Sequence, residues 1–165
     1  MVNVPPTANA KPPTTMEIPG SVHHILQGKP AHVWTITSDV LVIDAIRLMG
    51  EKDIGALVVT DGPAVLGMIS ERDYSRKVAL QGRTSRDTRV ADVISTPAVT
   101  VTQATSIPEC MRLMTQLRIR HLPVVDDHGL LAGIVSMGDL VNWTIRVQSE
   151  AIHHLEGYIT GQYPA

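Results

Sequence analysis

The sequence predicts a mixed α/β (α+β) protein that contains two copies of one β-α-β-β-α unit. A seven-residue pattern occurs twice in the 165-residue chain, as GMISERD from Gly67 and as GIVSMGD from Gly133. The run Arg47-Leu48-Met49 also recurs 65 residues later as Arg112-Leu113-Met114. Within each copy, short β-rich runs alternate with segments of helical periodicity. With 44% hydrophobic residues, a chain of this length can bury the core that such a fold needs.

The chain opens with a proline-rich stretch, residues 1–20, which has four prolines before residue 14. Such a composition favours an extended, disordered tail, and the Pro19–Gly20 pair marks its end. The segment Ser21–Gln27 then predicts a short leading helix.

Each unit begins with a β-rich run, Val33–Thr37 in the first copy and Val99–Thr102 in the second. A helix follows each run. In the second copy the pattern Ser106-x-x-Glu109 predicts a capping box, and Pro108 is tolerated in the first helical turn. The apolar residues of this helix recur at helical spacing, and they are Ile107, Cys110, Met111, Met114 and Leu117.

Two apolar strands complete each unit, joined by turns that contain Asp-Gly or His-Gly, as in a hairpin. A closing helix is expected to begin at each Ser-x-x-Asp, and Ser149–Thr160 predicts a trailing helix. The expected strands are Ala56–Thr60 with Val65–Ile69, and Leu122–Val125 with Leu131–Val135.

The predicted organisation has four parts. These are a disordered tail at 1–20, a first repeat at 21–84, a second repeat at 85–148, and a C-terminal helix and tail at 149–165.

Composition narrows the function classes. A net charge of −2 gives no general attraction to nucleic acid, and only 3% aromatic residues argue against a single-strand binder. No apolar run reaches the length of about 18 residues that spans a bilayer, and the N-terminus lacks the apolar region of a secretory signal. The single cysteine, Cys110, excludes an intramolecular disulfide framework and fits a reducing compartment. We therefore expect a cytoplasmic protein that binds neither membrane nor nucleic acid.

The repeated order of strands and helices resembles that of the CBS domain, which occurs as tandem pairs that form one compact module. The resemblance rests on both G-h-h-S-x-x-D patterns, where h is apolar, on the LPVVD strand, and on the repeat length. The resemblance covers residues 21 to about 148. The segment ISERDYSRK is similar to the corresponding sequence of stand-alone bacterial CBS pairs. The resemblance implies that the two repeats pack about a pseudo-two-fold axis and leave two clefts, each able to hold an adenine nucleotide.

The serine and aspartate of each repeated pattern have two interpretations. Ser-x-x-Asp at the end of a strand is a helix N-cap pattern, with Ser70 and Ser136 capping and Asp73 and Asp139 returning a bond. The resemblance adds that each aspartate binds a ribose while the serine and neighbouring basic side chains face phosphate. Capping and binding are compatible.

Basic residues make the two clefts unequal. Arg72, Arg76 and Lys77 follow the first serine, but Gly138 replaces the arginine after the second. Arg120 and His121 precede the second apolar strand, where related modules carry phosphate contacts, whereas the matching positions in the first repeat are Gly55 and Ala56. A solvated helix face for Arg72 and Lys77, and a partly buried strand residue for His121, are the structural alternatives. The resemblance further implies adenine contacts at Lys29 to Val33 for one cleft and at Ser95 to Val99 for the other.

We expect a non-enzymatic regulatory sensor of AMP, ATP or NAD-type nucleotides that acts on an effector protein the sequence does not identify. The alternatives are an interaction module without ligand, and an enzyme that uses the bound nucleotide, for which no acid-base or nucleophile constellation is present. Cys110 reads as a core residue. No metal is expected, because adjacent histidines such as His23 and His24 point about 100° apart on a helix.

Assembly as a homodimer is also expected. CBS pairs commonly associate through helical faces, and the trailing helix carries an apolar stripe at Ile152, Leu155 and Ile159.

Overall fold

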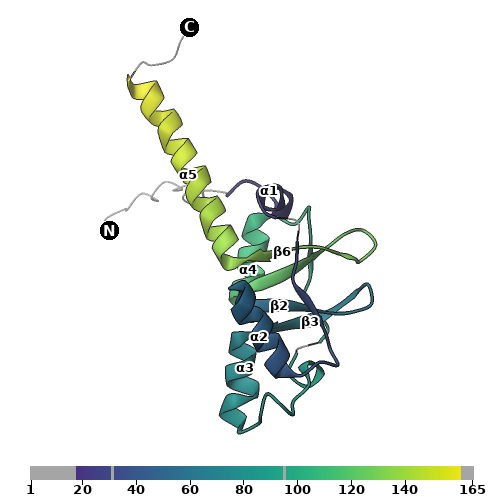
Figure 1. Cartoon of the computed structure of the whole chain (residues 1–165). Helices are drawn as coiled ribbons and strands as arrows, with labels where there is room; N and C mark the ends of the chain where they lie inside the picture. Colours follow the sequence, from purple (N-terminus) through teal and green to yellow (C-terminus); the bar gives the residue numbers. More distant parts are fainter. Residues whose placement is uncertain (1–17, 31, 95, 161–165) are drawn as a thin grey trace, which may run out of the picture.

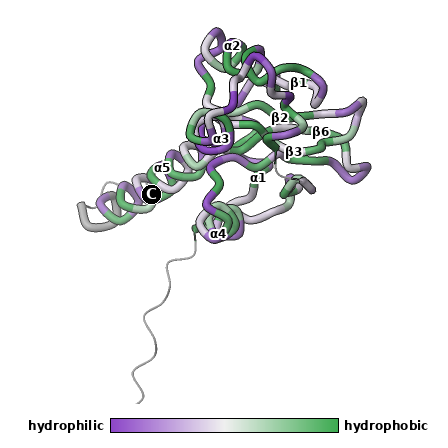
Figure 2. Tube along the Cα trace, turned by 90° about the horizontal axis from the view of Figure 1, so that it is seen from below, coloured by the Kyte–Doolittle hydropathy of each residue, from purple (hydrophilic) through white to green (hydrophobic). Residues whose placement is uncertain are grey.

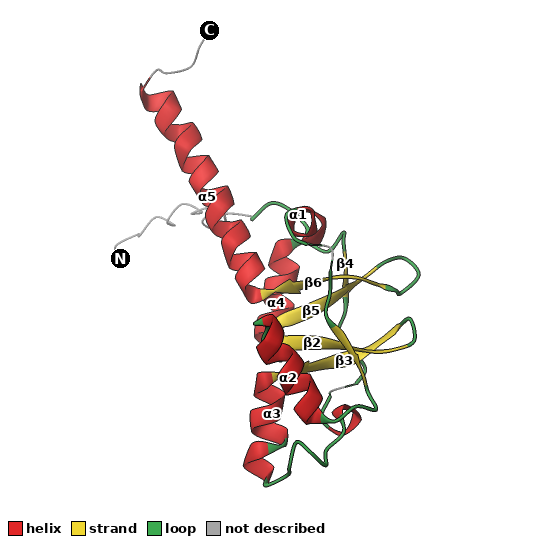
Figure 3. Ribbon diagram, in the orientation of Figure 1, coloured by secondary structure: helices red, strands yellow, loops and turns green. Residues whose placement is uncertain are grey.

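The computed structural model describes residues 18–30, 32–94 and 96–160, with side chains through Glu156. The predicted tail lies outside the described residues as far as residue 17, and Ser95 and the Ile159 side chain also lie outside them. The protein contains two three-stranded sheets, with helices along one side of the strands (Figures 1 and 3). The mixed α+β class predicted from the repeat is therefore confirmed.

The first unit follows the expected β-α-β-β-α order. Its sheet has the order β1-β2-β3, with β1 parallel to β2 and β2 antiparallel to β3. A short 3₁₀ segment, Ala79–Gln81, follows its last helix. The elements are β1 (Thr35–Thr37), α2 (Val42–Lys52), β2 (Ala56–Asp61), β3 (Ala64–Ser70) and α3 (Glu71–Lys77).

The second unit repeats the same topology in the order β4-β5-β6. Its antiparallel pair even repeats the irregularity of the first, because the register shifts between Val59 and Thr60 and again between Val124 and Val125. The elements are β4 (Val101–Thr102), α4 (Ile107–Leu117), β5 (His121–Val125), β6 (Leu131–Ser136) and α5 (Met137–Thr160).

The two units face each other about a local two-fold axis. Ala64 begins β3 and Leu130 directly precedes the equivalent strand β6, and the two residues pair with each other in an antiparallel bridge. Equivalent residues that pair in antiparallel fashion are what a two-fold axis between them produces. The groove between the units therefore has two related ends, one near α3 and one near α5.

Each hydrophobic core is completed by a segment from the other side of the repeat boundary. The leading helix α1 (Val22–Gln27) puts Val22 and Ile25 into the core of the second unit, beside Leu122 and Leu140. Backbone hydrogen bonds fix it there, since the Val22 amide donates to Thr105 O at 2.9 Å. The division at 84/85 follows the sequence period, whereas the packing places α1 with the second unit.

In the opposite direction, residues 90–93, which belong to the second sequence repeat, complete the core of the first unit. The 3₁₀ turn Val90–Asp92 precedes Val93, and both valines are buried with Val42 and Ile69 of the first unit. The Val42 amide donates to Thr88 O at 2.9 Å, so the linker between the units is part of the first core.

The closing and trailing helices predicted separately form one continuous helix, α5. Neither proline nor glycine interrupts it between Gly138 and Gly157, which explains why no break occurs. The helix extends away from the two units and mixes hydrophobic and hydrophilic residues along its length (Figures 1 and 2). Ile145, Ile152 and Leu155 are exposed on it. Across the described part of the chain, the helices all fall short of what crossing a membrane requires in length and apolar character.

Candidate functional site

A pocket of about 520 Å³ lies where α3 faces the second unit. From α3 and its cap it is lined by five predicted site residues, namely Ser70, Arg72, Asp73, Arg76 and Lys77. From the second unit it is lined by Val99, Arg120 and His121. Residues predicted from separate stretches of sequence therefore meet in one cavity.

The carboxylate of Asp73 is held in place by the end of β3. Asp73 Oδ2 accepts hydrogen bonds from the Ser70 amide at 3.1 Å and from Ser70 Oγ at 2.6 Å. The Asp73 amide donates in return to Ser70 Oγ at 3.3 Å, so the capping box is formed. The Asp73 side chain is still 26% exposed and lines the pocket. The capping interpretation is thus confirmed, and it leaves the carboxylate accessible.

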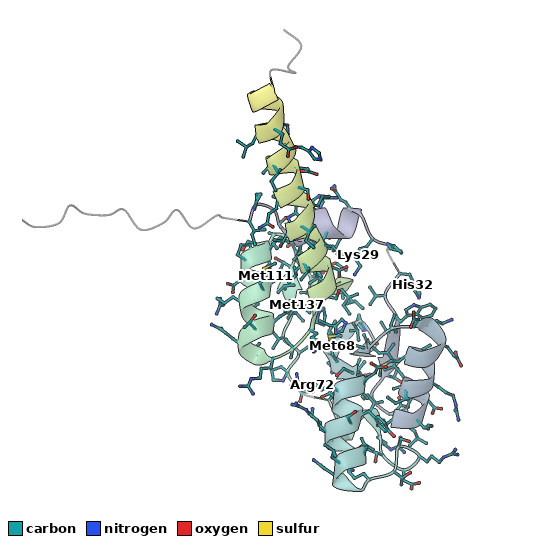
Figure 4. The ribbon with its side chains drawn as sticks, turned by 90° about the vertical axis from the view of Figure 1, so that its left-hand side faces the viewer. Lys29, His32, Met68, Arg72, Met111 and Met137 are labelled. Atoms are coloured by element: carbon teal, nitrogen blue, oxygen red, sulfur yellow. The ribbon has the colours of Figure 1, made fainter. Side chains whose placement is uncertain are left out.

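One cation pairs with this carboxylate, and others line the same pocket. Lys77 Nζ lies 2.9 Å from Asp73 Oδ1 and also donates to Val93 O at 2.7 Å. Arg72 Nη1 donates to Arg118 O at 2.7 Å and so connects α3 to the end of α4 (Figure 4). Arg76 and Arg120 are exposed side chains that line the same pocket. The pocket therefore combines the carboxylates of Asp73 and Glu71 with several positive charges.

His121 lies at the start of β5, opposite Ser136 in the sheet. Burial lowers the pKa of His121 below its ordinary value of 6.5; the charge of Asp139 opposes this, and those of Lys29 and Arg120 reinforce it. The imidazole is therefore neutral near pH 7, so His121 contributes hydrogen bonding rather than a positive charge to the pocket.

The other end of the groove is different. Asp139 Oδ2 accepts from the Ser136 amide at 2.7 Å and from Ser136 Oγ at 2.8 Å, as its counterpart Asp73 does with Ser70. The same oxygen also accepts from Lys29 Nζ at 2.7 Å. Burial would raise the pKa of Asp139, but the hydrogen bonds from Lys29 and Ser136 outweigh it and hold the pKa below the ordinary 3.8. A smaller pocket of about 240 Å³ beside this pair is lined mainly by α1 and α5.

Two predicted adenine contacts remain without direct structural support. Val33 is half-buried and lines neither of these pockets, and Ser95 lies outside the described residues. Lys29 reaches the second aspartate but makes an ion pair there, a contact that the sequence pattern does not indicate.

The structure adds pocket residues that sequence reasoning missed. Met68, Glu71, Leu117 and Arg118 all line the larger pocket. Arg118 ends α4 in a left-handed conformation with φ of 54°, and its carbonyl receives Arg72. Asp53 ends α2 with nearly the same φ of 52° at the equivalent position of the first unit, so the two repeats share this helix ending.

Cys110 is a core residue, as predicted, and the histidines of α1 contact neighbouring side chains. Cys110 is fully buried in the second core, where burial raises the pKa of its thiol to about 11. His24 packs against Trp143, and His23 Nδ1 lies 3.0 Å from Gln103 Oε1. Within the described ranges, no three His, Cys, Asp or Glu side chains are grouped as a metal ion would need.

Taken together, the paired units and the groove between them define a tandem α+β module whose two clefts carry equivalent aspartates. The chain belongs to the CBS domain family, whose model matches residues 30–80 and 90–146. The module is a CBS pair, as predicted.

Individual relatives support this assignment. A solved CBS-domain protein from Burkholderia ambifaria is 47% identical, with a TM-score of 0.73 over 76% of this chain and 94% of that one. The CBS domain-containing protein CBSX3, mitochondrial, of Arabidopsis thaliana is 41% identical over 79% of this chain, although the match spans only 65% of its own length. The CBS domain-containing protein YhcV of Bacillus subtilis is 35% identical over 66% of this chain and 76% of its own. None of these names denotes an enzyme.

Proposed function

We propose that this protein is a regulatory module that binds an adenine nucleotide, of the AMP, ATP or NAD type, in the pocket beside α3. The observation that carries the proposal is the meeting of Asp73 with Arg72, Arg76, Lys77 and Arg120 in one cavity. Its volume of about 520 Å³ falls within the range of about 300–1,000 Å³ that small-molecule sites occupy.

Each part of a nucleotide has a matching group in this pocket. The accessible Asp73 carboxylate can accept both hydroxyls of a ribose through charge-assisted hydrogen bonds. The arginines offer planar donors that suit phosphate oxygens. The apolar surface of Val99, Leu117 and Met68 can cover a base. Because α3 has only seven residues and Ser70 already caps it, the phosphate affinity is assigned to the side-chain cations.

Binding would be signalled through the contact between the two units. Arg72 Nη1 bonds to Arg118 O across the groove, and a phosphate near Arg72 competes for the same donor. A ligand that draws Arg72 away changes how α3 and α4 sit against each other, and so favours one arrangement of the module over another. We place the protein in the cytoplasm as a homodimer that regulates an effector protein. The reducing compartment is inferred from its one buried cysteine, and the dimer from the exposed apolar residues of α5.

An interaction module without ligand is the competing function, and a nucleotide-using enzyme is a third. The fully formed Ser70–Asp73 cap is the observation that favours the interaction module, because helix stability alone accounts for the geometry of both residues.

Calorimetric titration with AMP, ATP and NAD tests the proposal, together with mass spectrometry of any ligand released from the purified protein. We expect one phosphorylated nucleotide to bind, and Arg76→Gln to weaken it about tenfold or more while binding of unphosphorylated adenosine is unchanged. Arg47→Gln, which removes an exposed arginine paired with Asp44 on α2, is the matched control and should leave binding unchanged. Absence of binding for all three nucleotides would replace the sensor by the interaction module, and turnover of a bound nucleotide would establish the enzyme.

A further inference from the structure

The second cleft already contains a cation from the protein itself. Lys29 follows α1 and donates from Nζ to Asp139 Oδ2 at 2.7 Å and to Ile134 O at 3.2 Å. Ile134 stands in β6 where Met68 stands in β3, and Met68 lines the first pocket. The Lys29 side chain thus extends over the part of β6 at Ile134. The equivalent part of β3, at Met68, faces the cavity of the first cleft.

The ion pair at Asp73 does not have this effect. Lys77 reaches Asp73 from four residues along the same helix, so it lies at the side of the carboxylate, and a pocket of about 520 Å³ remains open. Lys29 comes from 110 residues away in sequence, from the segment that follows α1. Its side chain is 28% exposed and that of Asp139 is 19% exposed, so the pair is more enclosed than an ordinary surface salt bridge.

The position of Lys29 is fixed by the packing of α1. The Lys29 amide donates to Leu26 O at 3.2 Å, and Leu26 lies directly over Gly133 of β6. A Cβ on Gly133 would lie 2.8 Å from Leu26 Cδ2, which shows how closely α1 approaches this strand. Figure 4 shows Lys29 below α1 and beside α5, well apart from Arg72 at the start of α3.

The helix on this side of the groove, α5, lacks basic residues at the positions equivalent to those of α3, although its Arg146 lines the smaller pocket. Gly138, Asn142 and Trp143 take the places of the three cations of α3, and Trp143 is occupied by Arg146 above its ring at 4.4 Å. A ligand in this cleft would therefore meet the Asp139 carboxylate without counterparts of the three α3 cations, while Arg146 is held over the Trp143 ring.

We infer that Lys29 acts as a built-in occupant of the second cleft, so that the chain binds a single nucleotide, and that removal of its charge opens a second site selective for an uncharged ribonucleoside. The inference rests on the proposed function, because it assigns Asp139 the ribose-binding role proposed for Asp73. Since a ligand hydroxyl has to displace a charge-assisted hydrogen bond, Lys29 lowers the affinity of this cleft about 10- to 150-fold.

Calorimetric titration with adenosine in an Asp73→Ala background isolates the second cleft. We expect no binding to Asp73→Ala alone, and one adenosine per chain for Asp73→Ala combined with Lys29→Met, which keeps side-chain length without the charge. The event should disappear when Asp139→Asn is added, and AMP should bind this opened cleft more weakly than adenosine does. Lys29→Gln is the second opening variant, and the thermal melting of each variant establishes that it is folded. The matched control combines Asp73→Ala with Arg47→Met instead of Lys29→Met, and it should produce no new adenosine site.

The outcomes separate this inference from the proposed function. If the wild type binds one AMP but neither Lys29 variant gains an adenosine, Lys29 does not close the cleft while the nucleotide sensor stands. If the wild type binds two AMP molecules and Lys29→Met loses one of them, Lys29 is a ligand contact and the inference is wrong. If the wild type binds none of AMP, ATP and NAD, the proposed function fails, and an adenosine site gained by Lys29→Met would still support closure by Lys29. If neither protein binds anything, both fail.

Discussion

Replacing Asp73 by alanine separates the two roles that this carboxylate combines in the structure. Its oxygen Oδ2 accepts two hydrogen bonds from Ser70, and its other oxygen pairs with Lys77. Loss of the cap lowers the free energy of unfolding by about 1 kcal/mol without any ligand. Loss of charge-assisted hydrogen bonds to a ribose costs a further 1.5–3 kcal/mol or so of binding free energy, which is roughly a 10- to 150-fold loss of affinity.

A thermal-shift assay distinguishes these two effects. With AMP at about 100 times the wild-type Kd, ligand stabilises the wild type by about 2.7 kcal/mol, and the variant by about 0.3–1.4 kcal/mol. For a chain of this size each kcal/mol shifts Tm by about 2–4 °C. The ligand-induced increase should therefore fall from about 5–11 °C to about 1–6 °C, and the ligand-free Tm should fall by about 2–4 °C.

The control is Asp61→Asn, which changes an exposed aspartate at the β2–β3 turn, outside the pocket. It should alter neither the ligand-free Tm nor the increase with AMP. A lowered ligand-free Tm in Asp73→Ala with an undiminished AMP increase would mean that the carboxylate only caps α3, and the ribose role would be wrong.

Three further predictions follow from the packing, the titration and the surface of the protein. Gly133→Ala forces a methyl group against Leu26 and should cost about 1–3 kcal/mol in urea unfolding, recovered in part by Leu26→Ala, whereas Gly50→Ala, with open space around it, should be neutral or stabilising. Because the folded state holds the pKa of His121 below 6.5, the unfolded chain binds more protons just below that pH, so the free energy of unfolding should fall as pH drops from 7 to 5.5, and less so in His121→Gln. Ile152→Glu, on the exposed stripe of α5, should convert a dimer at micromolar concentration to a monomer by light scattering, and a monomeric wild type would contradict the assembly.

The repeat pattern was sufficient to predict the order of strands and helices in both units, whereas the clefts were implied by the resemblance to CBS pairs. Strand pairing follows from alternating apolar runs and tight turns, which are local in sequence, so both hairpins were predicted. The serine, aspartate and basic residues of the first pattern lie within eight positions on one strand end and one helix, and therefore reach one pocket wherever the helix packs.

The remaining features depend on contacts that no local pattern encodes. The Lys29–Asp139 pair requires that α1 crosses to the second unit, and that crossing is decided by which core has room for Val22 and Ile25. The unbroken α5 was divided in the sequence interpretation because a capping pattern marks where a helix begins more clearly than periodicity marks where it ends. The left-handed Arg118 was missed because backbone conformation at a helix end depends on the turn that follows it.

The exchange of segments between the two cores also sets an order of events during synthesis. The first core draws all of its residues from 36 to 94, so it can close as soon as the linker has left the ribosome. The second core needs both Val22 and Leu140, so α1, though translated earlier, has no partner until nearly the whole chain has been made. Among the described helices, the first to emerge therefore waits for the second unit before its apolar residues are buried.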